Sequence, residues 1–326
     1  MIKIGMISFA HMHAYSYAQG VLELDNAEIT GIYDDNIERG KAAAEQFNTT
    51  FYENLEDLLK QDLQAVMVCS ENSKHKEHVL KAAEFKKDIL CEKPIATNVA
   101  DAQIMIDACE KADVKLQIAY PVRFAQAIRE AKTIVDSGQL GEIKALVTTN
   151  RGRNPGGWFV DPKQSGGGAV LDHTVHMVDI ARWFLNEEVV EVKAEIDQMF
   201  SDIEIDDAGI LDLKFASGIM MTHDCSWSKN DRYPTWGDVT IEIIGSKASL
   251  FVDAFKDHFI SYSDHDAAVT ELFSGNNMDF ELVADFVDCV AQDREPSITG
   301  YDGLKSMEVA LKAYESDEKG QVVHIQ

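Results

Sequence analysis

A lysine that precedes a proline, Lys93, is the first residue whose type and position favour chemistry. It follows Glu92 and the apolar run Ile89-Leu90, which is typical of a buried strand. Proline disfavours helical backbone at the residue before it, so we expect Lys93 to be extended at the carboxyl end of that strand. Ligands of open α/β sheets bind at this edge, where an ammonium can stabilise a substrate oxygen. The same pattern is also typical of a surface lysine before a turn.

An acid and a histidine four positions apart, Asp172 and His176, form a second candidate group. They follow the triplet Gly166-Gly167-Gly168, which we expect to open a helix, and on a helix this spacing puts both side chains on one face. A carboxylate can orient an imidazole that transfers a proton near neutral pH. An ordinary acid beside a core histidine has the same spacing, but the glycines and Lys93 favour the catalytic interpretation.

Metal binding is the other chemistry that Asp172, His173 and His176 suggest. Zinc sites need three or four converging ligands, and we find no further partner at a suitable spacing. We therefore expect no metal site.

Aromatic residues in loops rich in glycine and proline predict a pocket for a small ligand. Trp158 and Trp236 lie in such loops, although core aromatic residues would fit the same pattern. Aromatic faces beside polar side chains suit sugar rings, which have apolar faces and polar rims. We therefore expect four residues to contact the substrate: Arg153, Trp158, His173 and Trp236.

The first half of the chain alternates apolar strand patterns with helix patterns. This alternation predicts an α/β fold with a doubly wound parallel sheet. Its first strand-to-helix turn is then expected to bind a dinucleotide pyrophosphate at the helix N-terminus. The expected strands are 2–7, 27–33, 65–69, 89–90 and 116–119, and the expected helices are 12–24, a segment ending at 47, 73–85 and 98–112.

The glycine-rich dinucleotide fingerprint is missing from this turn, which reads Ser8-Phe9-Ala10-His11-Met12-His13. In one interpretation the site persists, and the helix amides with His11 or His13 hold the phosphates; in the other, cofactor binding is lost. Asp34 favours the first, because an acid at the end of the second strand binds the ribose hydroxyls. No arginine follows it immediately to bind a 2′-phosphate, so we expect NAD rather than NADP.

Near residue 120 the pattern changes to long strands with alternating polarity. Such strands predict a mostly antiparallel sheet in a second domain of α+β type. We therefore expect a Rossmann-type NAD-binding domain over residues 1–120 and a substrate-binding and oligomerisation domain over residues 121–326. The expected strands are 143–151, 189–198, 208–215, 219–227, 238–244, 248–253, 258–261 and 322–325, and the expected helices are a segment ending at 136, 278–291 and 301–316.

The composition excludes several classes of protein. The chain has 326 residues and a net charge of -26, spread along the sequence, which repels phosphate backbones and argues against a nucleic-acid partner. Its five cysteines lie mostly in apolar segments, as expected of buried free thiols in a reducing compartment. We find no signal-peptide pattern and no stretch long enough to span a membrane, so we expect a soluble cytoplasmic protein.

These features together resemble the glucose–fructose oxidoreductase/inositol dehydrogenase family (Gfo/Idh/MocA) over nearly the whole chain. Glu92-Lys93-Pro94 is similar to the central motif of that family, whose lysine contacts the reacting hydroxyl. Asp172 and His176 match its D-x-x-x-H pair, and Gly166-Gly167-Gly168 matches the run before it. The missing glycine fingerprint is the clear departure. The resemblance also leads us to expect a cis peptide between Lys93 and Pro94.

The resemblance implies a set of cofactor contacts as well. Asn72 and His75 match the nicotinamide-side loop of the family, although Glu71 stands where proline is usual, and Arg123-Phe124 matches the pair that opens its second domain. Asn72 is also a good helix cap, and His75 would equally suit a solvent-facing helix position. The expected cofactor contacts are Ser8, Ala10, His11, Met12, Asp34, Cys69, Ser70, Asn72, His75, Glu92, Lys93 and Arg123.

The family implies NAD(P)-dependent oxidation of sugars, inositols and related alcohols, by dimers or tetramers formed through the outer face of the second sheet. We expect a dehydrogenase acting on a secondary hydroxyl of a sugar or cyclitol. In this scheme His176 takes the hydroxyl proton, Asp172 orients His176, and Lys93 stabilises the alkoxide, although Lys93 and His176 could exchange roles. A ligand-binding regulator without activity and an NAD-dependent glycosidase are the alternatives.

Overall fold

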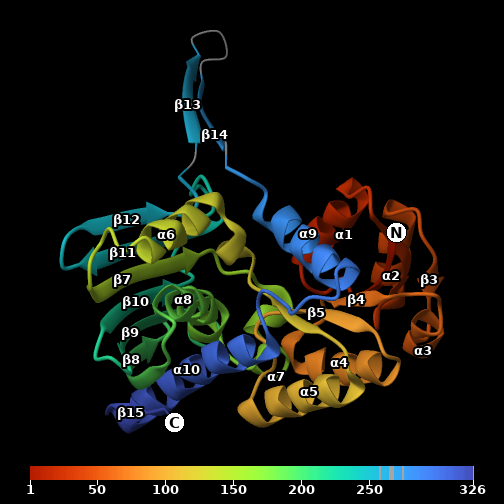
Figure 1. The fold of residues 1–326 in the computed structure, drawn as a ribbon, viewed down its shortest axis with the longest axis horizontal. Coiled ribbons are helices and arrows are strands. Elements are labelled where there is room, and N and C mark those ends of the chain that lie inside the picture. Colours follow the sequence, from red (N-terminus) through yellow and green to blue (C-terminus); the bar gives the residue numbers. More distant parts are fainter. Residues whose placement is uncertain (257, 264–267, 274, 326) are drawn as a thin grey trace. The chain divides into compact units, whose positions relative to one another are not determined.

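Two compact units make up the computed structural model, which describes residues 1–256, 258–263, 268–273 and 275–325. The first unit comprises residues 1–121, 161–166 and 279–307, and the second comprises residues 122–160, 167–278 and 308–326 (Figure 1). Along the chain, the boundary expected near residue 120 separates the two main sheets, but two later segments return to the first unit. Within the described residues, no helix is both long enough and apolar enough to cross a membrane.

The first unit holds a six-stranded parallel sheet. Its strands are β1 (Ile2–Ile7), β2 (Ala27–Tyr33), β3 (Phe51–Tyr52), β4 (Ala65–Val68), β5 (Asp88–Glu92) and β6 (Leu116–Ala119). They lie in the order β3-β2-β1-β4-β5-β6, so the direction of winding reverses between β1 and β4. Ligands of open α/β sheets bind at the carboxyl ends of the strands beside such a reversal. The predicted doubly wound sheet is confirmed, and the short strand β3 is an addition to it.

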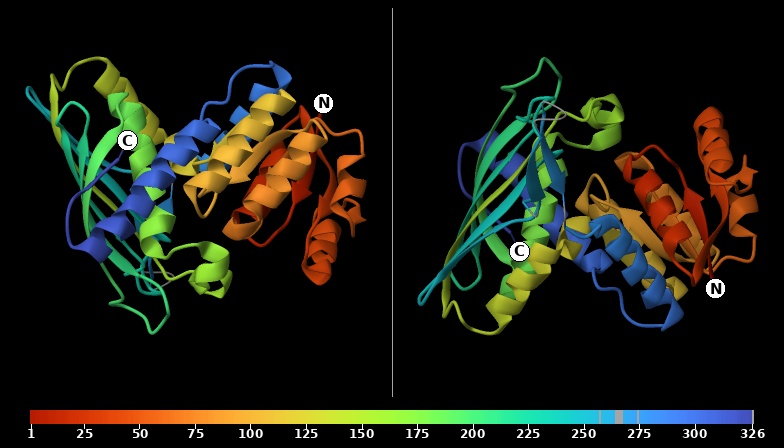
Figure 2. Two further views of the ribbon diagram at one scale, coloured as in Figure 1. Left: turned by 90° about the horizontal axis from the view of Figure 1, so that it is seen from below. Right: turned by 90° about the horizontal axis from the view of Figure 1, so that it is seen from above.

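Helices cover both faces of this sheet. On one face lie α1 (His13–Glu23) and α9 (Met278–Ala291), and on the other lie α4 (His75–Glu84) and α5 (Val99–Ala112) (Figures 1 and 2). Helices α1 and α9 pack closely at Gly20, where an added Cβ would lie 3.4 Å from Val283 Cβ. The remaining helices of this unit include α2 (Ile37–Gln46), α3 (Leu55–Leu59) and α7 (Pro162–Ser165).

The second unit holds a seven-stranded sheet. Its strands are β7 (Ile143–Gly152), β8 (Val189–Asp197), β9 (Ala208–Phe215), β10 (Met220–Ser226), β11 (Gly237–Gly245), β12 (Ser249–Asp253) and β15 (Val323–His324). Their order is β12-β11-β7-β10-β9-β8-β15, and every pair is antiparallel except β7 with β10. The predicted mostly antiparallel sheet is confirmed. Strands β13 (His258–Ser263) and β14 (Ala268–Phe273) form a separate hairpin, of which only the first strand was expected.

Helices pack on one of the two faces of this sheet. Helices α6 (Gln126–Asp136) and α8 (Ala169–Leu185) lie on one face, as does the carboxyl-terminal part of α10 (Gly300–Lys319) (Figure 2). Strand β9 shows the resulting alternation, because Leu211 and Leu213 are buried in the core of the unit and Ile210 is exposed. Among the described residues of this unit, no helix lies on the opposite face (Figure 2). All five cysteines are buried and free, as predicted.

Candidate cofactor and substrate sites

The turn between β1 and α1 closes tightly without a glycine. Ser8 is fully buried and has a φ of 70°, in the left-handed region that favours glycine. Its N–H donates to Tyr33 O at 2.7 Å, and its hydroxyl accepts from Ala10 N–H at 3.2 Å. Ser8 thus takes a glycine-like conformation at a cost of roughly 1–2 kcal/mol. Met12, the last residue before α1, is exposed.

Asp34 follows β2 and is buried, with every acceptor position of its carboxylate engaged. Its oxygens accept from Phe9 N at 2.7 Å and Asn36 N at 2.8 Å, and from Arg39 Nε at 2.8 Å and Nη2 at 2.7 Å. A carboxylate offers about four lone-pair positions, so a ribose hydroxyl would have to replace one of these donors. Arg39 is the donor that uses its side chain, and it is partly exposed; it lies in the first turn of α2 and was not expected at this site because it follows Asp34 by five positions.

Two histidines from the first turn meet the glutamate of the lysine motif. His13 Nδ1 lies 2.9 Å from Glu92 Oε1, and His11 Nδ1 lies 3.6 Å from the same oxygen. Burial opposes the charge on His13, but Glu92 more than offsets it, so the pKa of His13 is raised. Burial also opposes the charge on Glu92, yet the two histidines and Lys93 hold its pKa well below the usual range. Glu92 is therefore an ionised carboxylate with no exposed side-chain surface.

Lys93 follows β5 and is only 5% exposed. Its N–H donates to its neighbour Glu92 Oε2 at 3.0 Å, and its peptide bond to Pro94 is cis, as predicted. His75, the first residue of α4, holds the next turn, because its Nδ1 lies 2.9 Å from Pro94 O and its Nε2 lies 3.2 Å from Ser70 O. Burial lowers the pKa of His75. His75 is thus fully buried and fixes the backbone beside Lys93 instead of facing solvent.

The segment after β4 is tied into the first unit by its own polar groups. Cys69 O accepts from His11 N at 2.9 Å, and Ser70 Oγ lies 2.9 Å from His78 Nδ1. Asn72 opens a short 3-10 helix, Asn72–Lys74, and donates to Ser165 O at 2.8 Å. Burial raises the pKa of the Cys69 thiol well above its usual range. These residues therefore shape the loop, and their direct contact with a cofactor stays a prediction.

In the second unit, an acid and a tyrosine close the N-terminus of α8. Asp206 accepts from Gly168 N at 3.0 Å and from Val170 N at 2.8 Å. Tyr314 donates to Asp206 Oδ1 at 2.8 Å, and its hydroxyl oxygen accepts from Leu171 N at 3.2 Å. The first turn of α8 is thus capped by groups that the local sequence did not indicate, since both partners lie far along the chain.

Asp172 and its neighbours form a hydrogen-bonded group on α8. Asp172 Oδ2 accepts from Trp227 Nε1 at 3.3 Å and lies 3.3 Å from His173 Nε2. The other nitrogen of His173 lies 2.8 Å from Asn150 O. His176 lies one turn further along the helix and is buried. Trp227 and Asn150 are thus additional members of the candidate site, which sequence spacing alone did not reveal.

Arg123, which was expected to contact the cofactor, is engaged inside the second unit. Its Nε donates to Asp179 Oδ2 at 2.8 Å, and its guanidinium lies 5.1 Å from the centre of the Trp183 ring. Asp179 is fully buried, so this ion pair anchors the segment before α6 to helix α8. Any contact between Arg123 and a cofactor stays a prediction.

Two of the expected substrate contacts gather around Gly152 at the end of β7. A Cβ at Gly152 would lie 2.9 Å from His173 Cε1 and 3.0 Å from Trp236 Nε1, so only glycine leaves room for both rings. Arg153 donates to Tyr233 O at 2.5 Å, which orders the loop that carries Trp236. Trp158 lies elsewhere in the unit and stacks on Phe159 with ring centres 3.9 Å apart.

The predicted residues thus form two sets. The first unit contains Lys93 with the expected cofactor residues other than Arg123, and the second contains Arg123, Asp172, His176 and the expected substrate contacts. A Rossmann-type sheet with an acid after β2, joined in one chain to an antiparallel sheet domain, is typical of two-domain dinucleotide-binding proteins.

Comparison with known families agrees with this class. Residues 2–120 match a family described as an oxidoreductase family with an NAD-binding Rossmann fold, and residues 128–251 match the GFO/IDH/MocA C-terminal domain. The chain therefore belongs to the Gfo/Idh/MocA oxidoreductase family, as its motifs suggested, and its first domain is an NAD-binding Rossmann domain.

Relatives cover the whole chain. Myo-inositol 2-dehydrogenase of Thermotoga maritima is 29% identical, over 100% of this chain and 99% of the relative. An NADP-dependent D-xylose 1-dehydrogenase of Haloarcula marismortui is 28% identical, over 84% of this chain and 78% of the relative. The crystal structure of a probable dehydrogenase from Thermotoga maritima has a TM-score of 0.86 at 27% identity and covers 99% of this chain and 98% of that chain.

Proposed function

We propose that the protein oxidises a secondary hydroxyl of a sugar or cyclitol, with NAD as the hydride acceptor. The observation that carries the proposal is Lys93, a nearly buried lysine at the carboxyl end of β5 whose flanking backbone is fixed by Glu92 and His75. A polar side chain held this firmly at the ligand-binding edge of the sheet suits a role in chemistry. Relatives named for myo-inositol and D-xylose support the substrate class.

Two features of the first unit support NAD binding: the tight turn after β1 and the acid after β2. Ser8 supplies the tight turn, the N-terminus of α1 offers amides to the pyrophosphate, and Asp34 would hold the ribose hydroxyls in exchange for a bond to Arg39. When bound, NAD supplies the acceptor for a hydride from the substrate carbon.

The side chains of this protein would handle the proton and the charge. His176 takes the hydroxyl proton, and Lys93 stabilises the developing alkoxide by a charge-assisted hydrogen bond. Asp172, held by Trp227 and His173, orients the polar groups around the hydroxyl. The reverse assignment, with Lys93 as the base, predicts that a pH–rate profile loses its acidic limb in a Lys93 variant and keeps it in a His176 variant, because protonation of the base is what slows the reaction at low pH.

A screen of cyclitols and aldoses with NAD tests this proposal. Thermal shift detects ligands, and absorbance of the reduced nicotinamide detects turnover. NADH formation with a cyclitol or aldose supports a dehydrogenase. Ligand binding without NADH formation would support a regulator, and NAD-dependent cleavage of a glycoside would support a glycosidase.

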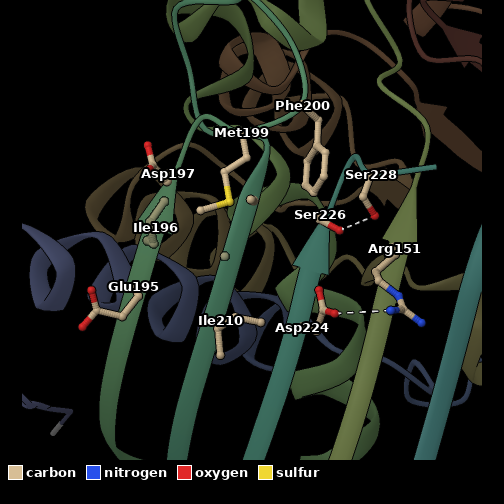
Figure 3. A pocket seen from close by; sticks show the side chains of 12 residues that line it. Arg151, Glu195, Ile196, Asp197, Met199, Phe200, Ile210, Asp224, Ser226 and Ser228 are labelled. Atoms are coloured by element: carbon tan, nitrogen blue, oxygen red, sulfur yellow. Dashed lines mark hydrogen bonds and ion pairs between the residues drawn. The ribbon is translucent and has the colours of Figure 1, made fainter. Parts of the chain in front are cut away.

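We also propose that the protein is a cytoplasmic homodimer or homotetramer that associates through the open face of the second sheet. This face carries a pocket of about 460 Å³. Figure 3 shows side chains that line it, among them Arg151, Asp224 and Ile210 from the strands and the neighbouring Met199 and Phe200. The exposed residues Val147, Ile210, Met220 and Phe251 share this face through the strand register. A second copy of the face would cover these apolar side chains.

The buried free thiols support a reducing, cytoplasmic location.

A further inference from the structure

Three side chains in the first unit form a group to which the proposed mechanism assigns no proton or charge transfer. His11, His13 and Glu92 each offer one ligand atom, and these atoms all lie within 4.8 Å of one another. The histidine rings lie edge to face with centres 4.5 Å apart. The sequence expectation of no metal site weighed only the residues on α8, so it did not consider this group.

The spacing of the group suits a small metal ion. Ligands bound tetrahedrally at about 2.0–2.1 Å from zinc lie about 3.3 Å from one another. The distances from Glu92 Oε1 to His13 Nδ1 (2.9 Å) and to His11 Nδ1 (3.6 Å) lie on either side of that value. His11 Nδ1 also accepts from His13 N at 3.2 Å, so it would exchange this hydrogen bond for the metal when the rings adjust to bind the ion.

The backbone already holds the three ligands in place. His11 lies in the turn after β1 and donates its N–H to Cys69 O at 2.9 Å, and His13 begins α1. Glu92 ends β5, and its second oxygen accepts from Lys93 N at 3.0 Å. The side chains of His11 and Glu92 are buried, whereas that of His13 is 25% exposed, which leaves an entry path on one side.

We propose that His11, His13 and Glu92 bind one divalent transition-metal ion, such as zinc. Two imidazoles and one carboxylate are a ligand set of zinc and ferrous sites, and they leave open positions on the metal. Magnesium and calcium prefer oxygen ligands and are therefore a poor match. Among neighbouring charges, Asp279 favours a cation in the group and Lys93 opposes it. The formal charge of -26 on the chain also favours cation entry.

Calorimetric titration of the chelator-treated full chain with Zn²⁺ tests the proposal, with Co²⁺ absorbance as a second readout. We expect one ion per chain, and visible Co²⁺ bands typical of nitrogen and oxygen ligands. Loss of an outer-shell partner weakens metal affinity about 10–100-fold, so His13→Ala and Glu92→Gln should each weaken it by at least about 100-fold. His13→Ala should fold normally, because its side chain is partly exposed. The matched control is His324→Ala, which removes a surface histidine from β15.

The binding experiment also has outcomes that overturn the proposal. Absence of stoichiometric Zn²⁺ binding would show that the group is only a histidine–carboxylate ion pair. Equal binding by the wild type and by His13→Ala and Glu92→Gln would place the ion elsewhere on this acidic chain. Neither readout depends on enzyme activity, so the outcome is independent of the proposed dehydrogenase function.

Discussion

At the scale of single residues, Asp172 is held from two sides. Its Oδ2 accepts from Trp227 Nε1 at 3.3 Å and lies 3.3 Å from His173 Nε2. His173 is fixed in turn, because its Nδ1 lies 2.8 Å from Asn150 O. A carboxylate fixed in this way suits an orienting role.

Replacing Lys93 by methionine should abolish most turnover and leave NAD binding nearly unchanged. Methionine keeps the length and apolar stem but removes the ammonium, and loss of such a stabilising donor costs about 10²–10³ in kcat. His176→Ala should lose about 10²–10⁴, and the double variant should lose much less than the product, because both groups serve one proton transfer. Steady-state kinetics and calorimetry with NAD measure these effects.

The matched control for Lys93→Met is Lys87→Met, at the other end of β5. Lys87 donates to Leu63 O at 2.8 Å, so its loss affects the opposite edge of the sheet. Retention of most activity by Lys93→Met would disprove its catalytic role. Loss of NAD binding instead would make Lys93 a cofactor residue.

The Asp34–Arg39 pair predicts a change of cofactor preference. Arg39→Ala frees Asp34 for the ribose hydroxyls and removes the cation that could meet a 2′-phosphate, so the affinity ratio of NAD to NADP should rise. Asp34→Ala should move the ratio toward NADP, by at least about 10-fold. Calorimetric titration of both variants with both cofactors measures this. If neither variant changed the ratio, the pair would not select the cofactor.

At the scale of elements, the sequence pattern predicted the longer strands and helices of both units but not the short ones. Strand β3 has two residues and helix α3 has five, so neither is long enough to show a periodic pattern of apolar residues. The mostly antiparallel sheet was predicted from alternating polarity along its strands, which is a local signal.

The parts of the site that could not be predicted depend on contacts between distant positions. Ser8 takes the place of a glycine, and its positive φ is stabilised by the hydrogen bond from its N–H to Tyr33 O. Asp34 is bound to the same turn by accepting from Phe9 N. A fingerprint pattern records neither of these contacts. In contrast, Lys93, Asp172 and His176 could be proposed from the sequence because a lysine before a proline and a four-residue spacing on one helix are local patterns. The partners Trp227 and Asn150 lie on other strands and left no local pattern.

The cap of α8 predicts a loss of stability for Asp206→Ala. This change leaves Gly168 N, Val170 N and the Tyr314 hydroxyl without their acceptor. Loss of a helix cap or of a buried hydrogen-bond partner costs about 1–3 kcal/mol. Urea unfolding should show this decrease, whereas Asp212→Ala on the exposed face of β9 should change stability by much less. Equal effects of the two substitutions would argue against a structural cap.

At the scale of the whole molecule, a buried histidine links folding to pH. Burial and nearby His173 lower the pKa of His223 to about 3, and Thr148 Oγ1 lies 2.9 Å from its Nδ1. In the unfolded chain its pKa is about 6.5, so the unfolded state takes up a proton first as the pH falls. The contribution of His223 to stability is therefore complete above about pH 6.5 and is lost progressively toward pH 3.

His223→Gln should make the stability less dependent on pH. Glutamine stays neutral, so the slope of the unfolding free energy below pH 6 should fall by about 1 kcal/mol per pH unit, out of about 1.4 for one proton. Urea unfolding at several pH values measures the slope. The matched control is His324→Gln on the surface, which should keep the wild-type slope. Identical slopes for both variants would show that His223 does not titrate as described.

Association through the open sheet face should depend on its apolar side chains and on salt. Ile210 is 49% exposed on that face, and Ile210→Glu would place a charge where a second copy is expected. Ile104→Glu adds the same charge on α5, where Ile104 is 45% exposed, and so controls for the charge alone. By light scattering at micromolar concentration, the wild type and Ile104→Glu should be oligomers and Ile210→Glu should be a monomer. Because each chain carries a formal charge of -26, added salt should strengthen association. A monomeric wild type, or equal dissociation of both variants, would contradict the proposed interface.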